Sequence, residues 1–255
     1  MEAKIDINKR GEPSTIQSLM NYELLANLFK YPQNELYKRN IKDVYEYLLK
    51  TLPEAAEALK GFMEFTTTSS IVEIQELFLR SFDVQAITTL DIGFILFGED
   101  YKRGKLLVHL NEEHRKAGNN CETELADHLP NLLRLLPKMD DEAIRRELAT
   151  FLLLPAVVKM ISEFSYEKID KKDVVYKKHQ KVILDYSPNY RTVYQKCLQT
   201  LFLVLKNDFG YEPEPDKKSF EAQGLNDPNN PASYNVDSGI KDFSQHIETD
   251  ILTDK

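Results

Sequence analysis

Apolar positions recur along most of the chain with the period of an amphipathic α-helix. The first stripe, over residues 41–49, falls on one face of a 3.6-residue repeat and predicts a helix there. This stripe and three later ones consist of Ile41, Val44, Tyr45, Leu48 and Leu49; of Ile71, Ile74, Phe78 and Phe82; of Leu125, Leu129, Leu132, Leu133 and Leu136; and of Tyr190, Val193, Tyr194, Cys197, Leu198, Leu201 and Leu205. Because each stripe needs an apolar partner, we expect these helices to pack on one another.

Two helix starts are predicted from capping signals. Ser70 with Glu73, and Thr51 with Glu54, have the spacing of a capping box. In a capping box the hydroxyl and the carboxylate each accept a backbone N–H that has no partner within the helix. We therefore expect one helix to begin just after each of these two hydroxyl residues.

The remaining pattern favours an all-α fold. No segment shows convincing alternation of apolar and polar residues, and no glycine occurs between Asn119 and Phe209. So long a span is hard to thread through hairpin turns without a residue that adopts positive φ cheaply. Residues 151–158 are apolar on every side, which predicts a central buried helix, and Pro155 should kink it. We expect one compact helical bundle over residues 16–210.

Residues 211–255 differ in composition from the rest of the chain. They hold four of the eleven prolines, and ten acidic residues against four lysines. Such a segment cannot bury enough apolar surface to offset its ordering entropy, so we expect a largely disordered acidic tail. Within it, residues 240–251 are a candidate for folding on a partner. We also expect residues 1–15 to be a mobile arm.

Composition narrows the function classes. Of 255 residues, 33 are basic and 41 acidic, so the net charge of −8 disfavours a nucleic-acid partner. The longest stretch without charge, residues 148–158, is far shorter than the ~20 residues of a membrane-spanning helix. Cys121 and Cys197 form no CxxC pattern, and the start of the chain lacks the apolar core of a secretory signal. We therefore expect a cytoplasmic protein.

Common catalytic motifs are missing from the sequence. It contains no G-x-G-x-x-G, no P-loop, no G-x-S-x-G and no H-E-x-x-H. A di-iron bundle needs Glu-x-x-His on two helices, and none of the five histidines has a glutamate three residues before it. We therefore expect neither an enzyme nor a cofactor.

One group of residues leaves a metal site open as an alternative. His109, His114 and His128 are near other donors in the sequence, namely Glu112, Glu113, Cys121, Glu124 and Asp127. However, His109 and His114 are five residues apart, which is about 140° around a helix, so they do not share a face. We therefore favour the interpretation without a metal, and we interpret Cys121 as a structural residue rather than a nucleophile.

Three motifs occur in order along the middle of the chain. They are an aromatic-x-x-x-Phe-Asp over residues 78–83, a Gly-Glu-x-x-x-Arg-Gly over 98–104 and a Glu-Leu-x-Asp-His-Leu-Pro over 124–130. Together with residues 22–26 and 29–32, they resemble the signature of the NarJ-type chaperones, the nitrate reductase delta subunits, within the TorD/DmsD group of redox-enzyme maturation proteins. The resemblance extends over about residues 20–165.

The resemblance implies a function and a partner. It implies a TorD-like helical cytoplasmic chaperone that is not part of the finished enzyme, present as a monomer or a helix-swapped dimer. Such chaperones bind the apo catalytic subunit of a molybdenum oxidoreductase, chiefly its N-terminal segment, until the molybdenum cofactor is inserted. They share these motifs with chaperones of selenate, chlorate and hydrocarbon-oxidising enzymes, which remain an alternative.

The resemblance also implies a set of peptide-binding residues. The family's positions correspond here to Phe78, Phe82, Leu125, Asp127 and His128, and the turn at Arg103 and Gly104 is expected to shape the adjacent wall. On physical grounds, Phe78 and Phe82 at i and i+4 offer an aromatic edge to an amphipathic helix. Three carboxylates nearby are expected to attract the basic residues of such a segment, and they belong to Asp83, Glu124 and Asp127.

Simpler interpretations of these residues stay open. Phe78 and Phe82 at helical spacing are often core residues, and Asp127 has the position of a cap for the helix that follows it. Arg103 is also typical of a junction between a loop and a helix. Two other function classes stay open as well, a metal-dependent helical hydrolase and a helical adaptor that works through its acidic tail.

Overall fold

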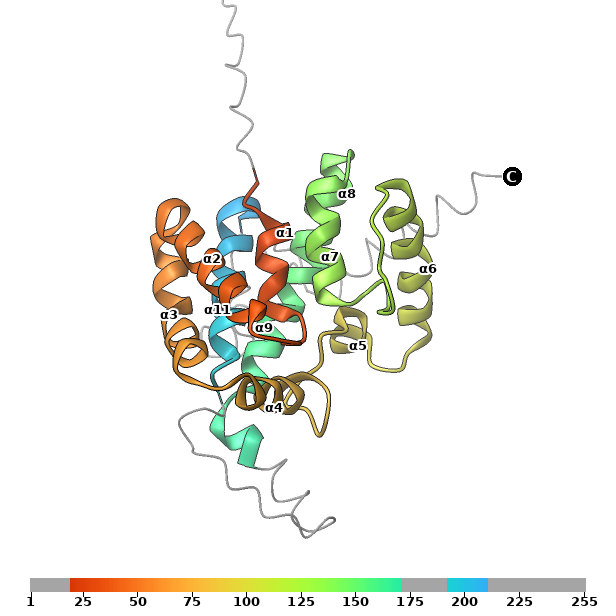
Figure 1. Cartoon of the computed structure of the whole chain (residues 1–255). Coiled ribbons are helices and arrows are strands. Elements are labelled where there is room, and N and C mark those ends of the chain that lie inside the picture. Colours follow the sequence, from red (N-terminus) through yellow and green to blue (C-terminus); the bar gives the residue numbers. More distant parts are fainter. Residues whose placement is uncertain (1–18, 171–191, 211–255) are drawn as a thin grey trace, which may run out of the picture.

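Helices make up nearly all the regular structure of residues 19–170 and 192–210, the parts of the chain that the computed structural model describes (Figure 1). In these parts the β contribution is a single isolated antiparallel bridge between Asp91 and His128. The predicted all-α bundle is confirmed. The expected arm over residues 1–15 and the expected tail over 211–255 lie outside the described residues. No described helix combines the length and apolar character that crossing a membrane requires.

The α-helices, together with the 3-10 helices η1 and η2 and the π-helix η3, are α1 (Tyr22–Leu25), η1 (Ala26–Phe29), α2 (Leu36–Thr51), α3 (Pro53–Thr68), α4 (Ile71–Phe82), α5 (Ile92–Phe97), α6 (Tyr101–Lys116), α7 (Leu129–Leu135), η2 (Leu136–Lys138), α8 (Glu142–Glu147), η3 (Leu148–Leu153), α9 (Leu154–Glu163) and α11 (Gln195–Phe209). The four apolar stripes of the sequence correspond to α2, α4, α7 and α11 in the order of elements along the chain.

The core lies where α11 packs against α3 and α9. Figure 1 shows α2, α3 and α11 on one side of the molecule and α5, α6, α7 and α8 on the other, with α9 between them. The predicted stripe that ends in α11 is buried from Val193 to Leu205, as at Cys197 and Leu198, whereas its first member, Tyr190, lies outside the described residues. The stripe of α2 is buried at Ile41, Val44 and Leu48, but the side chain of Leu49 is 49% exposed, so this stripe is narrower than predicted.

Only one of the two predicted capping boxes forms. The Ser70 hydroxyl accepts the Glu73 N–H, and the Glu73 carboxylate accepts the Ser70 N–H at 2.7 Å, which starts α4 as predicted. The prediction for Thr51 is wrong, because Thr51 is the last residue of α2 and its hydroxyl donates to the Tyr47 carbonyl. The next helix begins at Pro53, which supplies a preset φ and no N–H that would need a cap.

The predicted central helix is interrupted by a π-helical segment. Residues 148–153 form η3, and Pro155 is in the first turn of α9. Because η3 leads directly into α9, Pro155 lies inside a continuous helical run, and the π-helical turn before it is an irregularity typical of a site where an i→i−4 hydrogen bond is lost. Leu153 and Leu154 are fully buried, whereas Val158 is 38% exposed, so the expectation of burial on every side is wrong at the end of this segment.

The third stripe begins later than predicted. Leu125 is 50% exposed and lies in the connection before α7, which starts at Leu129. The four later leucines of this stripe are fully buried, and they are Leu129, Leu132, Leu133 and Leu136. The displaced start matters because Leu125 belongs to the motif over residues 124–130.

Candidate functional site

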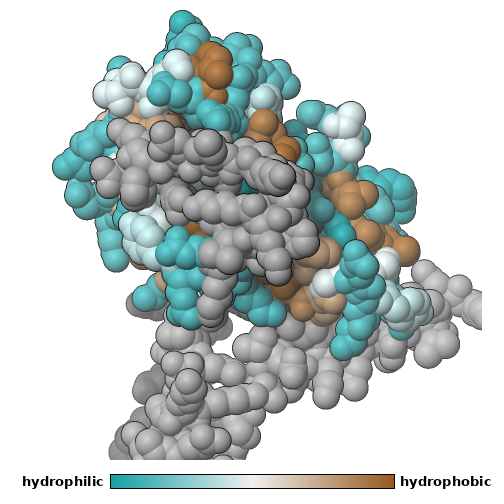
Figure 2. All heavy atoms as spheres, turned by 90° about the horizontal axis from the view of Figure 1, so that it is seen from below, coloured by the Kyte–Doolittle hydropathy of each residue, from teal (hydrophilic) through white to brown (hydrophobic). Residues whose placement is uncertain are grey.

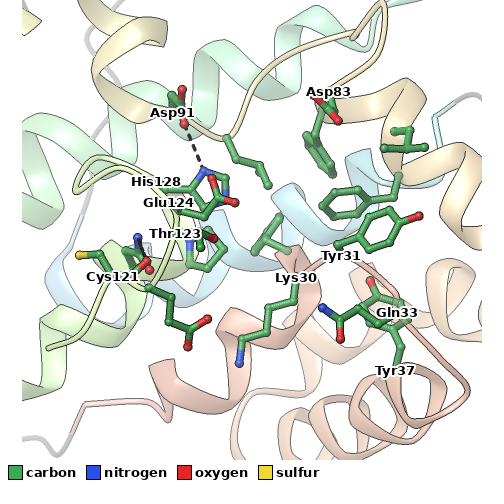
Figure 3. A pocket seen from close by; sticks show the side chains of 18 of the residues that line it. Lys30, Tyr31, Gln33, Tyr37, Asp83, Asp91, Cys121, Thr123, Glu124 and His128 are labelled. Carbon is green, nitrogen blue, oxygen red and sulfur yellow. Dashed lines mark hydrogen bonds and ion pairs between the residues drawn. The ribbon is translucent and has the colours of Figure 1, made fainter.

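A cleft of about 790 Å³ brings together most of the residues that the sequence motifs predict (Figure 3). It lies between α4, the connection from η1 to α2, the loop after α4 and the connection from α6 to α7. Of the expected peptide-binding residues, those that line the cleft are Phe78, Phe82, Asp83, Glu124 and His128. Arg103, Leu125 and Asp127 are not part of the lining.

The aromatic wall of the cleft is the outer edge of the core. Phe78 and Phe82, on successive turns of α4, lie with ring centroids 5.2 Å apart. Both rings also contact Tyr194, which is completely buried, at 5.6 and 5.3 Å. Only 7% of Phe78 and 6% of Phe82 is exposed, so the interpretation as core residues is confirmed for most of each ring. A peptide contact at their exposed edges stays a prediction.

Tyr31 covers part of this wall. Its ring is edge-on to Phe78 with centroids 5.6 Å apart, and the side chain is 42% exposed. Gln75 on α4 holds the segment after it, because the Gln75 amide donates to the Pro32 carbonyl at 2.8 Å. The segment 29–32 therefore forms one side of the cleft. It belongs to the motif resemblance, but the sequence alone did not mark any residue in it as a site residue.

Asp127 has a different role from the one expected. Its side chain is fully buried and pairs with Arg103, whose Nε donates to the Asp127 carboxylate at 3.0 Å. The expectation that this carboxylate attracts basic residues of a peptide is wrong, because solvent does not reach it. The alternative that Asp127 caps α7 is also wrong, since the N-cap is His128 and no side chain caps this helix. The Asp127 carbonyl instead accepts the Ile92 N–H at 2.9 Å.

Arg103 connects this buried pair to the lining of the cleft. Its Nη2 donates to Asp91 at 3.1 Å, and the other oxygen of Asp91 accepts from His128 Nδ1 at 3.1 Å. The hydrogen bond from His128 is the largest cause that holds the pKa of Asp91 below its usual value, and the charges of His128 and Arg103 add to it. This hydrogen bond holds His128 at the turn before α7.

Gly93 allows this charge network to pack tightly. A Cβ atom at this position would lie 2.6 Å from the Asp127 carboxylate and 3.1 Å from Cγ of Arg103. The first turn of α5 thus approaches the buried ion pair at a distance that only glycine permits. Asp91 and Gly93 carry no recognisable sequence signal, because their function depends on residues that are far away in the chain.

The rim of the cleft carries charges of both signs. Asp83, the C-cap of α4, and Glu124 are exposed, and neither makes an ion pair within residues 19–170 and 192–210. Lys30 is also exposed and without an ion pair in these residues. Arg134, by contrast, contacts Glu122 at 3.4 Å and donates to Asn131 at 2.6 Å. The cleft can therefore offer free carboxylates and one free ammonium group to a ligand.

The candidate metal ligands do not come together in the described residues. Across the ranges that the structure covers, no three His, Cys, Asp or Glu side chains are arranged to hold a metal ion. His114 is buried between the Asn119 amide, 2.9 Å from its Nδ1, and the Ala126 carbonyl, 3.0 Å from its Nε2. Burial is the largest cause that lowers the pKa of His114. These contacts fix the connection between α6 and α7.

Apolar side chains are also exposed outside the cleft. Tyr101 and Val108 on α6 are 75% and 70% exposed, and Phe94 on α5 is 41% exposed. Figure 2 shows hydrophobic side chains beside hydrophilic ones on its right-hand side, where α5 and α6 lie. None of these three residues lines the cleft. Exposed apolar residues are common on protein surfaces. We therefore assign the candidate site to the cleft and not to these three residues.

The comparisons with known proteins agree with the motifs. No protein-family model matches the chain. A relative from Bacillus subtilis (strain 168), named "Probable nitrate reductase molybdenum cofactor assembly chaperone NarJ", is 24% identical over 174 residues. The resemblance to the NarJ-type chaperones is confirmed. The alignment covers 67% of this chain and 90% of the NarJ relative, so the similarity spans nearly all of that protein rather than one motif.

Proposed function

We propose that this chain is an assembly chaperone for a nitrate-reductase-like molybdoenzyme. It binds the apo catalytic subunit, mainly through that subunit's N-terminal segment, and allows the molybdenum cofactor to be inserted before the complex assembles. In this proposal the chain acts in the cytoplasm by binding alone, and the cofactor is cargo of the partner. The observation that carries the proposal is the cleft, in which two of the family's motifs converge in a chain similar to NarJ.

The lining of the cleft suits an amphipathic peptide segment. Its volume of about 790 Å³ is in the upper part of the range of ligand pockets, which extends to roughly 1,000 Å³. One side is aromatic, at Tyr31, Phe78 and Phe82, and the opposite side is the polar connection that carries Thr123 and Glu124. An amphipathic segment can place its apolar face on the first side and polar groups on the second.

Co-purification tests this function directly. The tagged chain is isolated from cells that make the catalytic subunit either with or without molybdenum cofactor synthesis. We expect the apo subunit to be retained and the mature holoenzyme to be released. Equal retention of both forms, or no retention of the apo form, would contradict the proposal.

The choice of segment is tested in the same cells. A catalytic subunit that lacks its N-terminal segment is expressed beside the intact subunit, and retention of each is compared. We expect the truncated subunit to be retained at a much lower level. If both are retained equally, the main contact lies elsewhere on the partner.

A further inference from the structure

We infer that Lys30 is a specificity-determining residue of the cleft and selects an acidic side chain in the bound segment. This inference rests on the proposed function. It adds a requirement that the aromatic wall and the exposed carboxylates of the rim do not predict. Those two features favour a segment that is apolar and basic. Lys30 adds the need for one carboxylate at a fixed place.

The backbone of Lys30 is held on both sides. The residue before it, Phe29, is 1% exposed, and its ring lies 6.4 Å from that of Phe82. The residue after it, Tyr31, packs edge-on against Phe78. Lys30 itself is the extended residue that ends η1. With both neighbours anchored on α4, the position of its Cα relative to the aromatic wall is fixed.

The side chain of Lys30 reaches into the cleft. Figure 3 shows it between Tyr31 and Gln33 on one side and the loop that carries Cys121 and Thr123 on the other. A long aliphatic stem can lie along the wall while the ammonium group stays available to a polar partner. The amine is therefore placed where the apolar and polar sides of the cleft meet.

Lys30 differs from the other basic groups of the lining. Arg134 is paired with Glu122 and donates to Asn131. His128 is bonded to Asp91. Within the described residues, Lys30 is thus the basic group of the lining that keeps its hydrogen-bonding capacity for a ligand. A carboxylate on the bound segment satisfies this ammonium group without disturbing any existing pair.

The test uses calorimetry with a synthetic peptide that has the N-terminal sequence of the catalytic subunit encoded in the same genome. In a peptide series, each Asp or Glu is replaced in turn by Asn or Gln. We expect one replacement to weaken binding to the unchanged chaperone roughly two- to fivefold, the range for partly exposed ion pairs. The Lys30→Met variant should bind the original peptide more weakly than the unchanged chaperone by the same factor. With the neutralised peptide, the variant and the unchanged chaperone should have equal affinities.

Lys60→Met is the matched control, because Lys60 lies on α3 outside the cleft and its loss changes the net charge equally. Its affinity should equal that of the unchanged chain. The inference is overturned if Lys30→Met and Lys60→Met bind alike, or if no neutralised peptide binds more weakly. A failure of the unchanged chain to bind the original peptide would instead overturn the choice of segment in the proposed function, and with it this inference.

Discussion

Arg103 Nε donates to a carboxylate oxygen of Asp127 at 3.0 Å, and the Asp127 side chain is entirely inaccessible to solvent. Removing one member of a buried ion pair leaves the other charge uncompensated, which costs about 3–5 kcal/mol. We therefore expect Arg103→Met to lower the free energy of unfolding by about 3 kcal/mol. Urea denaturation followed by circular dichroism measures this change.

The double variant Arg103→Met with Asp127→Leu controls for the loss of charge. Replacing both partners of a buried pair by apolar side chains is often nearly neutral. The double variant should therefore recover most of the stability that Arg103→Met loses. If it is no more stable than the single variant, the pair is not the source of the effect.

Gly93 and Gly104 provide a matched pair of substitutions. In Gly93→Ala the new Cβ would lie 2.6 Å from the Asp127 carboxylate, so we expect a loss of about 1–3 kcal/mol in the free energy of unfolding. Gly104 is inside α6 with no atom within 4 Å of a Cβ, and Gly104→Ala should raise the stability by up to about 1 kcal/mol. Thermal melts of both variants measure the difference, and a shift of the same sign in both would contradict the assigned packing.

His114 makes stability depend on pH in a defined direction. Burial lowers its pKa in the folded chain, whereas the unfolded chain keeps a value near 6.5. The unfolded state then binds the proton first as the pH falls, so the free energy of unfolding decreases below about pH 6.5 until the folded-state pKa is passed. We expect His114→Gln to show a smaller decrease over this window.

Denaturant titrations between pH 8 and pH 5 check the His114 prediction. The difference in the free energy of unfolding between the unchanged chain and His114→Gln should shrink as the pH falls, because burial favours the neutral imidazole over its charged form. Arg134 and Lys138 face the ring and also disfavour its charged form. Parallel pH curves for the two proteins would show that another group controls the dependence.

Substitution of the exposed carboxylates of the rim should lower the affinity for the peptide and leave the fold intact. Asp83→Lys combined with Glu124→Lys should weaken binding of the N-terminal peptide roughly five- to tenfold or more, because two attractive contacts to basic residues become repulsive. Calorimetry measures the affinity. Glu46→Lys with Glu57→Lys, on α2 and α3 outside the cleft, changes the net charge by the same amount and should leave the affinity unchanged.

The parts of the fold that depend on local sequence could be predicted well. The stripes of α2, α4 and α11 and the cap at Ser70 rest on contacts within about one helical turn. The cap predicted at Thr51 failed because Pro53 provides a competing helix start two residues later. Spacing alone does not decide between two such starts.

The site could be predicted only in part. Phe78 and Phe82 were placed on the cleft by their motif, but that motif does not show that each ring is mostly buried against Tyr194. The burial of Asp127 depends on Arg103, which is 24 residues earlier in the chain and on α6, whereas Asp127 lies in the turn before α7. No periodicity connects such positions, because the contact arises only when the helices pack.

The β-bridge between Asp91 and His128 limits how far the cleft can open. Leu129 N–H donates to the Leu90 carbonyl at 2.8 Å, and Ile92 N–H donates to the Asp127 carbonyl at 2.9 Å. These two rungs tie together backbone segments from opposite ends of the α5 and α6 hairpin, so this border of the cleft cannot widen without breaking them. The opposite, aromatic side is also anchored, because Tyr31 packs edge-on against Phe78. A bound segment must therefore fit a gap whose width is set on both sides.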